Sequence, residues 1–423
     1  MNVLDDLDAR GLIQDTTDRG ALAARLAQGP TAAYYGCDPS ADSLHVGNLI
    51  GLLVLRRLQD AGHRPIALAG GATGMVGDPG GRSSERALLD DDTLAANVAA
   101  IKEQMARLVD FDAGPNGAIL VDNRDWTGEL RLLTFLRDVG KHVTVNKMLA
   151  RESVRARLAS EQGISFTEFS YMLLQANDYL WLFDHLGCEL QIGGSDQWGN
   201  IVSGVDLVRR VRGSTVHALS WPLLTAPDGS KLGKTTGASI WLSPRRTSPY
   251  RFFQHWMQVD DRQLATFLAQ FTLLPMPEVA AAVAAHLEAP GRREGQRLLA
   301  REATTLVHGA EAARTAARAS ALLFGSPVEG IDAATMATLA GEIPTTEVAA
   351  ADLGDGLDLV DLLVRAGAAG SKGDARRLVA QGAISLNGRV ASAGATVTAA
   401  DVQHGRHLLV RRGKAYHLVV VRS

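Results

Sequence analysis

The fold is decided by Ala32-Ala33-Tyr34-Tyr35-Gly36-Cys37 and the tetrapeptide that follows it, His45-Val46-Gly47-Asn48. The first stretch is apolar and predicts a buried strand, whereas Ile50, Leu53 and Leu58 fall on one face of a helix that begins near Asn48. A strand, a tight turn and a helix N-terminus form an anion site, because free backbone N–H groups and the helix dipole point the same way. The stretch therefore predicts an anion site at the start of an α/β domain, although an ordinary turn stays possible.

Strand and helix signals alternate from about residue 31 to residue 225. Short buried strands are predicted at residues 64–70, 118–122 and 188–193, with long Ala/Leu-rich helical stretches between them. This alternation predicts a Rossmann-like, doubly wound, mostly parallel sheet with helices on both faces. Ligands of such sheets bind beyond the carboxyl ends of the strands. The segments expected there are Gly36–Asp38, Gly70–Asp78 and Gly193–Gln197.

Composition limits the class of protein. A chain of 423 residues with 46% hydrophobic residues predicts two or three domains with a large core. No apolar stretch is long enough to span a membrane, and the acidic N-terminus lacks a signal core, so we expect a cytoplasmic protein. Two cysteines, Cys37 and Cys188, provide neither a disulfide framework nor a four-ligand zinc site, and no bound metal is expected.

Charge is distributed unevenly along the chain. The net charge is −3, yet residues 356–423 carry +6 and the remaining residues −9. A basic tail on an acidic body predicts that polyanion binding is concentrated in the tail. In this tail, two predicted helices precede a hairpin on the turn Asn387-Gly388.

A second motif, Lys231-Leu232-Gly233-Lys234-Thr235, places two cations and a hydroxyl in a Gly-containing loop suited to gripping phosphates. The two motifs resemble the HxGH and KMSKS signatures of class I aminoacyl-tRNA synthetases, the second in the tyrosyl form KFGKT. From about Leu4 to Arg422 the chain resembles the bacterial tyrosyl-tRNA synthetases, including their S4-like C-terminal RNA-binding module. The resemblance implies that the chain activates tyrosine with ATP and transfers it to the 3′ end of its tRNA.

The resemblance also implies a domain plan. Residues 1–225 would form the catalytic domain, with an inserted helical dimerisation region at about 125–165. The sequence itself predicts a helical domain at residues 226–325. It also predicts a linker at residues 326–355, where the potential core is thin and Pro327 and Pro344 occur. By the resemblance, residues 356–423 would form a small α+β S4-like domain. The family is homodimeric, so we expect a homodimer.

A tyrosine pocket is expected along one predicted helix. Tyr171, Gln175 and Asp178 lie at i, i+4 and i+7, so they share a face that needs water or a polar ligand. The spacing matches Tyr-x-x-x-Gln-x-x-Asp of the tyrosyl enzymes. By this resemblance, Asp178 and Tyr34 bind the phenolic hydroxyl of the substrate. The ammonium group would be held by Asp78, Tyr171 and Gln175 with Asp38 nearby, and Gln197 would touch the substrate carbonyl.

The resemblance assigns the remaining residues to ATP, to the reaction and to tRNA. ATP, entering with Mg²⁺, would contact Gly36, His45, Gly47, Gly194, Asp196, Lys231 and Lys234. Charge on the reacting phosphates would be stabilised by His45, Asn48, Ser40, Lys231, Lys234, Thr235, Arg82 and Arg86. The two arginines would contact pyrophosphate, although they could equally be surface residues. The tRNA would contact Lys372, Arg376, Arg377 and Arg389.

Three residues depart from the family pattern. Asn48 replaces the second His of HxGH, Tyr35 stands where Cys is common, and Leu232 replaces Phe. Two alternatives stay open at this point. Tryptophan could be the substrate, because the tryptophanyl enzymes share the fold, although Tyr34 and Asp178 favour tyrosine. The chain could also be an inactive RNA-binding relative, which the change at Asn48 would explain.

Overall fold

The computed structural model describes residues 2–79, 89–160, 163–224, 239–354 and 356–422. These residues form two units. The first contains Met1–Ser248 and His255–Val307, and the second contains Pro249–Gln254 and His308–Ser423. Among the described residues, no helix combines the length and apolar character that crossing a membrane requires.

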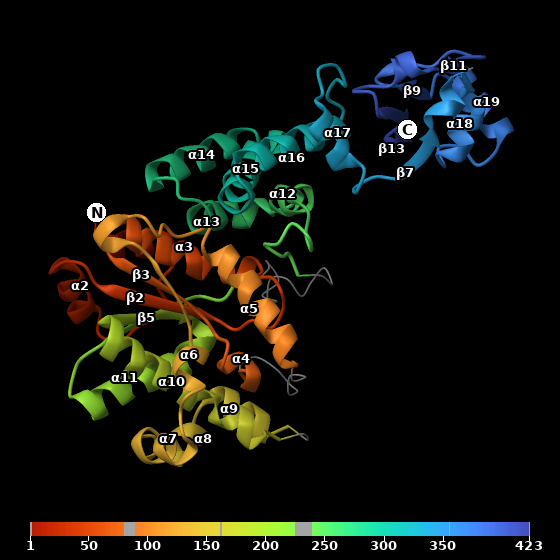
Figure 1. The fold of residues 1–423 in the computed structure, drawn as a ribbon. Coiled ribbons are helices and arrows are strands. Elements are labelled where there is room, and N and C mark those ends of the chain that lie inside the picture. Colours follow the sequence, from red (N-terminus) through yellow and green to blue (C-terminus); the bar gives the residue numbers. More distant parts are fainter. Residues whose placement is uncertain (1, 80–88, 161–162, 225–238, 355, 423) are drawn as a thin grey trace. The chain divides into compact units, whose positions relative to one another are not determined.

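A six-stranded sheet forms the centre of the first unit (Figure 1). All neighbouring strands run parallel except the pair β1 and β6. The expected doubly wound parallel sheet is therefore confirmed, and the strand order reverses between β2 and β5, where such folds bind ligands. In spatial order the strands are β1 (Asp15–Thr16), β6 (His217–Trp221), β5 (Cys188–Gly194), β2 (Ala32–Cys37), β3 (Arg64–Ala69) and β4 (Ile119–Asp122).

Helices cover both faces of this sheet. α3 (Val46–Asp60) and α5 (Asp91–Met105) lie on one face, and α10 (Phe166–Leu186) and α11 (Trp198–Arg212) lie on the other (Figure 1). Local sequence sets the ends of α10, because the Ser165 side chain accepts from the Glu168 amide and Gly187 takes a left-handed conformation at the C-terminus. The remaining helices of the first part of this unit are α1 (Val3–Ala9), α2 (Arg19–Ala27) and α4 (Thr73–Val76).

The inserted region expected near 125–165 consists of short helices. They are α6 (Arg124–Thr127), α7 (Leu132–Asp138), α8 (Val145–Leu149) and α9 (Glu152–Leu158). A buried ion pair ties α9 to α10, because Arg157 and Glu168 lie 2.8 Å apart with side chains 3% and 1% exposed. α7 instead leaves apolar side chains in solvent, with Leu132 70% and Leu133 78% exposed.

Three further helices complete the first unit: α13 (Asp261–Phe271), α14 (Met276–Glu288) and α15 (Glu294–His308, whose last residue belongs to the second unit). The last carbonyls of α13 have no partner within their own helix. Two buried arginines bind carbonyls at this end and just beyond it. Arg10 donates to the Ala269 and Leu274 oxygens, and Arg57 donates to the Ala269, Gln270 and Thr272 oxygens. Since Arg57 belongs to α3, these bonds fix α13 to the helix that begins beside His45.

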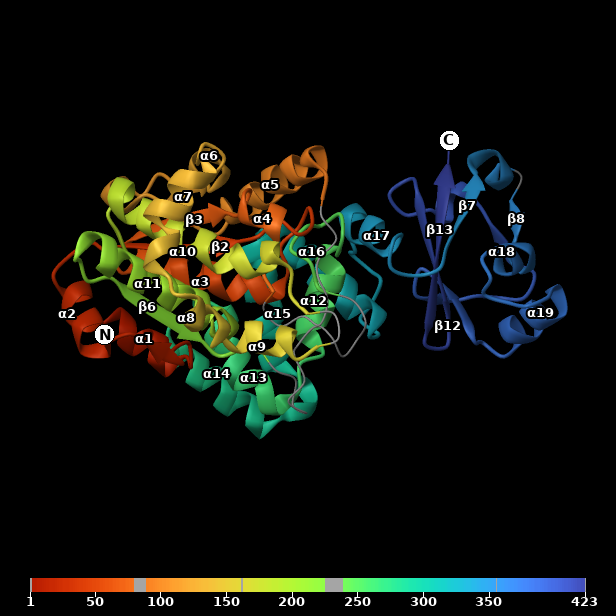
Figure 2. The same cartoon turned by 90° about the horizontal axis from the view of Figure 1, so that it is seen from below.

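The second unit contains a five-stranded sheet in the order β10-β9-β12-β13-β7 and a two-stranded pair, β11-β8. Asn387 and Gly388 both have positive φ and join β9 to β10, which confirms the expected hairpin. α18 and α19 pack on one side of the sheet, where Leu362, Leu363 and Val410 share a core (Figure 2). The elements are α12 (Pro249–Met257, whose residues from His255 belong to the first unit), α16 (Ala310–Leu323), α17 (Ala333–Leu339), β7 (Thr345–Ala349), β8 (Leu357–Asp358), α18 (Leu359–Arg365), α19 (Lys372–Ala380), β9 (Ile384–Leu386), β10 (Arg389–Val390), β11 (Thr396–Val397), β12 (His407–Arg412) and β13 (Ala415–Arg422).

The boundaries expected in this part differ from the structure. Residues 326–355 were expected to be a linker, but they contain α17 and β7, and β7 pairs in parallel with β13. The helical domain expected at 226–325 is also divided, since α16 belongs to the second unit. Leu322 of α16 shares a core with Leu409 and Leu418 of the sheet, and this non-local packing orders a segment whose sequence is poor in large apolar residues.

Candidate functional site

The site lies beyond the carboxyl ends of β2, β3 and β5. Cys37 at the end of β2 pairs with Ala69 at the end of β3, and Tyr34 of β2 pairs with Gln191 of β5. The segments that follow these ends carry Asp38, Thr73 and Asp196, so the three polar segments predicted from the sequence follow neighbouring strands.

One wall of the pocket carries a buried carboxylate. Asp178 is 2% exposed and accepts hydrogen bonds from Asn123 Nδ2 at 2.9 Å and Trp126 Nε1 at 2.8 Å. Burial raises the pKa of Asp178 to about 7, although the two hydrogen bonds act in the opposite direction. Both donors point at the carboxylate and fix its orientation.

Tyr34 lies near this carboxylate and is incompletely bonded. It is 2% exposed, and its hydroxyl oxygen is buried with no hydrogen-bond partner within the described part of the chain. Burial raises the pKa of the Tyr34 phenol well above its ordinary value, and the charge of Asp178 adds to this effect. A buried polar atom without a partner costs about 1–3 kcal/mol. A ligand hydroxyl bound here would satisfy Tyr34 and Asp178 together.

The other side of the pocket is rich in hydrogen-bond acceptors. Tyr171 Oη donates to Asp38 Oδ2 at 2.9 Å, and Gln197 Nε2 donates to Asp78 Oδ2 at 2.5 Å. Gln175 Oε1 is buried and has no partner among the described residues. Two carboxylates and an amide oxygen form a set of acceptors that suits a cation such as a substrate ammonium.

The His45 segment begins α3 as predicted. His45 is the N-cap residue, and its backbone amide donates to Asn48 Oδ1 at 3.1 Å. Although the His45 side chain is partly open to solvent, the surrounding protein desolvates the ring and lowers the pKa of this histidine below 6.5. Gly47 allows the close approach of the ring, since an added Cβ would lie 2.7 Å from His45 Cε1. The site therefore presents a mostly neutral imidazole at neutral pH.

The segment that follows the second motif lies beside His45. Val46 N donates to the Ile240 oxygen at 3.0 Å, Leu242 N donates to the Leu44 oxygen at 2.8 Å, and the rings of His45 and Trp241 are 6.2 Å apart. Lys231, Lys234 and Thr235 fall in 225–238, and Arg82 and Arg86 fall in 80–88, so these five predicted residues lie outside the described residues. The described chain resumes at Ser239, directly before the residues that bond to the His45 segment.

The residues assigned to ribose and phosphate line the open side of this edge. Gly36, Ser40 and Asp196 are exposed, and Gly194 at the end of β5 is partly exposed. Asp196 lies close to the backbone of β5, because an added Cβ at Gly194 would be 2.8 Å from Asp196 Oδ1. Glycine at this position therefore leaves room for the carboxylate at the strand end.

Tyr35 and Gly51 form a close contact that the sequence does not reveal. Tyr35 is 8% exposed and makes an edge-to-face contact with Trp221 at 5.5 Å. Its ring covers Gly51 of α3 so closely that an added Cβ would lie no more than 2.7 Å from three ring carbons. Tyr35, one of the three residues that depart from the family pattern, thus requires glycine at position 51 of the neighbouring helix.

Sequence reasoning missed three polar residues of the pocket: Thr73, Asn123 and Trp126. Thr73 Oγ1 donates to Asp38 Oδ1 at 2.8 Å, and Asn123 Nδ2 donates to Thr73 Oγ1 at 3.0 Å. Asn123 directly follows β4, so the rule that ligands meet strand ends could have identified it. No such signal marks Trp126.

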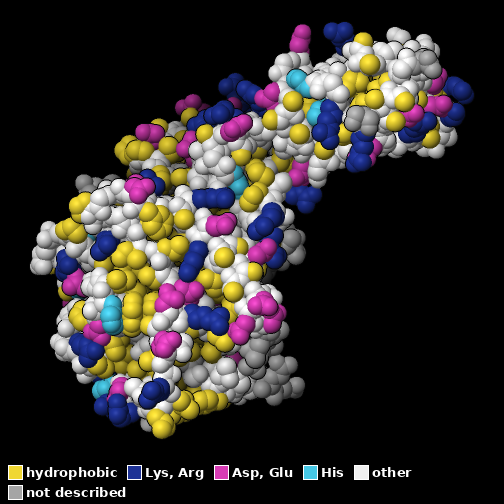
Figure 3. Space-filling model, in the orientation of Figure 1, with side chains coloured by type: hydrophobic (Ala, Val, Ile, Leu, Met, Phe, Trp, Pro, Cys, Tyr) yellow, Lys and Arg dark blue, Asp and Glu magenta, His cyan; other side chains and the backbone are white. Residues whose placement is uncertain are grey.

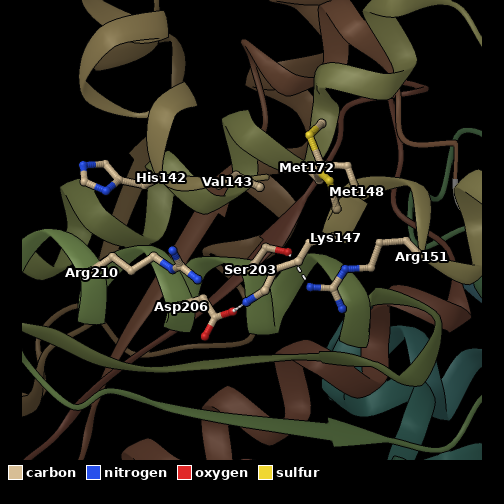
Figure 4. A pocket seen from close by; sticks show the side chains of 9 residues that line it. All are labelled: His142, Val143, Lys147, Met148, Arg151, Met172, Ser203, Asp206 and Arg210. Carbon is tan, nitrogen blue, oxygen red and sulfur yellow. Dashed lines mark hydrogen bonds and ion pairs between the residues drawn. The ribbon is translucent and has the colours of Figure 1, made fainter. Parts of the chain in front are cut away.

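A second hollow lies apart from the pocket around Tyr34 and Asp178, between the inserted helices and α11 (Figure 4). Its cations are partly paired, since Lys147 lies 2.8 Å from Asp206 and Arg151 Nη2 donates to Ser203 Oγ at 2.8 Å. Met172 also lines it, on a different side of α10 from Tyr171. Within the described residues, no group of three or more His, Cys, Asp or Glu side chains is arranged to hold a metal.

The four predicted tRNA contacts are all exposed in the second unit. Lys372 pairs with Asp361 at 2.5 Å and Arg377 with Asp374 at 2.6 Å. In the described part of the chain, Arg376 and Arg389 form no ion pair. Figure 3 shows Lys and Arg side chains on the surface of this unit.

Known proteins match the whole chain. The model of the class I tRNA synthetases (W and Y) matches residues 26–325, and that of the tyrosine–tRNA ligase SYY-like C-terminal domain matches residues 335–420. The tyrosine–tRNA ligase of Opitutus terrae is 53% identical over 422 residues and covers 99% of both chains. The one from Roseiflexus castenholzii is 48% identical over 420 residues, again with 99% of both chains covered.

A solved structure agrees with these matches. The C-terminally truncated mitochondrial tyrosyl-tRNA synthetase of Aspergillus nidulans superimposes with a TM-score of 0.70 at 32% identity, covering 76% of this chain and 94% of that one. Full-length similarity to tyrosine–tRNA ligases removes tryptophan as the alternative substrate and the inactive relative as the alternative class. The chain belongs to the class I tRNA synthetases and, within them, to the tyrosine–tRNA ligases.

Proposed function

We propose that the pocket between Tyr34, Asp178 and Asp78 binds tyrosine, with its phenol at Tyr34 and Asp178 and its ammonium at the opposite side. The observation that carries this proposal is the buried hydroxyl of Tyr34, which has no partner among the described residues and lies beside a buried carboxylate. A site built for a hydroxyl rejects the analogue that lacks it, because its polar groups stay unpaired. Tyrosyl-tRNA synthetase is the standard example, with roughly 10⁵-fold rejection of phenylalanine.

The ammonium end is proposed to use Asp38, Asp78, Tyr171 and Gln175. The Gln175 oxygen, which lacks a partner in the part of the chain that the structure describes, and the acceptor-rich wall support this role. Gln197 donates a hydrogen bond to Asp78, so its side chain would lie beside the carboxyl group of the bound substrate. This orientation directs the carboxylate of tyrosine toward the His45 side of the sheet edge.

In the proposed reaction the tyrosine carboxylate attacks the α-phosphorus of ATP, which gives tyrosyl-adenylate and releases pyrophosphate. A hydroxyl of the terminal adenosine of tRNA then attacks the carbonyl of the adenylate, and AMP leaves. No protein nucleophile is required. Catalysis consists mainly of positioning the reactants and stabilising charge on the phosphates.

ATP is proposed to lie against Gly36, Gly47, Gly194 and Asp196, with Mg²⁺ carried in by the nucleotide. Phosphate charge would be met by His45 and Ser40 and by the residues outside the described part, which are Lys231, Lys234, Thr235, Arg82 and Arg86. Asn48 already binds the His45 amide, so its proposed role is to hold the start of α3 in place.

The exposed cations Lys372, Arg376, Arg377 and Arg389 are proposed to bind tRNA. Arg376 and Arg389 are the stronger candidates, because acidic neighbours partly neutralise Lys372 and Arg377. Replacing Arg376 and Arg389 by Ala should weaken tRNA charging and leave adenylate formation unchanged. Equal charging by this double variant and the parent would contradict the assignment.

The apolar surface of α7 supports the proposal of a homodimer. Leu132, Leu133 and Leu136 are 70%, 78% and 46% exposed. Figure 3 shows hydrophobic side chains at the lower edge of the first unit, where α7 and α8 lie in Figure 1. Exposed apolar patches of this kind usually mark an interface.

Tyrosine-dependent ATP–pyrophosphate exchange tests the proposed site, with phenylalanine and tryptophan as comparisons. Exchange with tyrosine alone, which is lost in Asp178→Ala, would support the pocket. Equal exchange with phenylalanine and tyrosine would refute the hydroxyl-binding role of Tyr34 and Asp178.

A further inference from the structure

A continuous chain of hydrogen bonds joins the two ends of the tyrosine pocket. Thr73 Oγ1 donates to Asp38 Oδ1 at 2.8 Å and accepts from Asn123 Nδ2 at 3.0 Å. The same Asn123 nitrogen donates to Asp178 Oδ2 at 2.9 Å. Thr73 and Asn123 are 3% and 0% exposed, so the protein rather than water completes this chain.

The direction of every bond in this chain is fixed. An ionised carboxylate can only accept, so the Thr73 hydroxyl must donate to Asp38 and accept from Asn123. Asn123 is fully used, because its oxygen accepts from Ala72 N at 2.7 Å and its two N–H groups serve Thr73 and Asp178. A change at either end of the chain therefore changes the partners available in the middle.

We propose that Thr73 is a positioning residue that couples recognition of the substrate ammonium to recognition of its phenolic hydroxyl. When an ammonium binds near Asp38, the Thr73 hydroxyl keeps Asn123 aligned, and Asn123 keeps Asp178 oriented toward the phenol. The coupling rests on the proposed tyrosine pocket. Thr73 would thereby affect the preference for tyrosine over phenylalanine without touching the phenol. Asn123 lies between Thr73 and Asp178, the carboxylate that distinguishes the two substrates.

The test is Thr73→Val, which keeps the shape of the side chain and removes its hydroxyl. We expect kcat/KM for tyrosine to fall about tenfold, the usual size of a lost buried hydrogen bond. The fall for phenylalanine should be smaller, so the preference for tyrosine narrows. Thr73→Ser restores the hydroxyl and should restore the preference.

Thr304→Val is the matched control. Thr304 is 0% exposed, and its hydroxyl has no hydrogen-bond partner in the described residues, so the same chemical change occurs away from the pocket. This variant should keep the parental preference for tyrosine. A role of Thr73 confined to the ammonium end would reduce tyrosine and phenylalanine activity equally, and that result would overturn the coupling.

A measurement on the unmodified protein covers the case in which Thr73→Val does not fold. Competitive binding is compared for tyrosine, phenylalanine and the corresponding two acids that lack the amino group. Coupling requires the hydroxyl to strengthen binding more in the amino acids than in the acids. If the hydroxyl strengthened binding equally in the amino acids and in the acids, the coupling would be refuted. If the protein preferred none of the four compounds, the tyrosine pocket itself would be refuted.

Discussion

Tyrosine binding should become tighter as the pH rises from 6 to 8, because the phenol is proposed to donate to ionised Asp178. Burial sets the pKa of this carboxyl at about 7 in the unliganded protein. About one molecule in eleven then carries the ionised form at pH 6, and about ten in eleven at pH 8. Since apparent affinity scales with the competent fraction, the dissociation constant should fall up to about tenfold.

The two phenols of the pocket do not share this titration. Burial raises the pKa of the Tyr34 and Tyr171 phenols well above 10, so both stay protonated. Desolvation lowers the pKa of His45 below 6.5, and measuring tyrosine binding without ATP keeps the nucleotide side out of the comparison. The slope between pH 6 and pH 8 therefore reports Asp178.

The stability of the unliganded protein should fall as the pH rises, whereas its affinity for tyrosine should increase. A carboxyl whose pKa is higher in the folded chain than in the unfolded chain favours folding below its unfolded pKa, and this benefit is lost as the pH rises through the folded pKa. A change from 3.8 to about 7 corresponds to roughly 4 kcal/mol. The unliganded protein should thus lose stability between about pH 4 and pH 7, and stabilisation by tyrosine should increase over pH 6 to 8.

Calorimetric titration of tyrosine at several pH values measures this effect. Asp178→Asn cannot ionise, so its weaker affinity should be independent of pH over this range. Phenylalanine, which lacks the hydroxyl, should show no gain with the parent protein. A flat profile for tyrosine, or the same slope in Asp178→Asn, would refute the proposed role of this carboxylate.

Three further predictions follow from buried contacts and exposed surface. Trp126→Phe keeps a ring beside Trp181 but removes the 2.8 Å hydrogen bond to Asp178. The preference for tyrosine over phenylalanine should therefore narrow about tenfold in pyrophosphate exchange. An unchanged preference would show that Asn123 alone suffices to orient Asp178. Glu168→Gln leaves Arg157 buried and uncompensated and should lower the free energy of unfolding in urea by about 3–5 kcal/mol, whereas a loss below 1 kcal/mol would contradict a desolvated pair. Leu133→Glu places a charge on the exposed face of α7 and should give a monomer in sedimentation, and a persistent dimer would move the interface elsewhere.

Much of the catalytic fold could be predicted because its signals are local. The run from Ala32 to Cys37, the periodic helix after His45 and the glycine after Leu186 each act through neighbouring residues, and the structure forms β2, α3 and the end of α10 there. The second unit was harder to predict. Its α16 and β7 are ordered by partners distant in sequence, such as Leu418 and the strand β13, so their own composition resembles a connection.

The site shows the same division. The polar spacing of Tyr171, Gln175 and Asp178 and the family motifs predicted a tyrosine pocket from the sequence, and the roles given to these residues stay predictions. Thr73 and Trp126 were missed because their importance comes from what they touch across the pocket, Asp38 and Asp178. Contacts between side chains that are far apart in the chain leave no periodic trace in the sequence.

The contact between Tyr35 and Gly51 restricts the order in which substitutions at these two positions can accumulate during evolution. Any side chain at position 51 meets a buried aromatic ring that Trp221 confines on another side, so a larger residue there is tolerated only after position 35 has become smaller. If position 51 became larger first, its new side chain would occupy the space of the Tyr35 ring. Only a smaller side chain at position 35 would leave room for a side chain at position 51 in this chain.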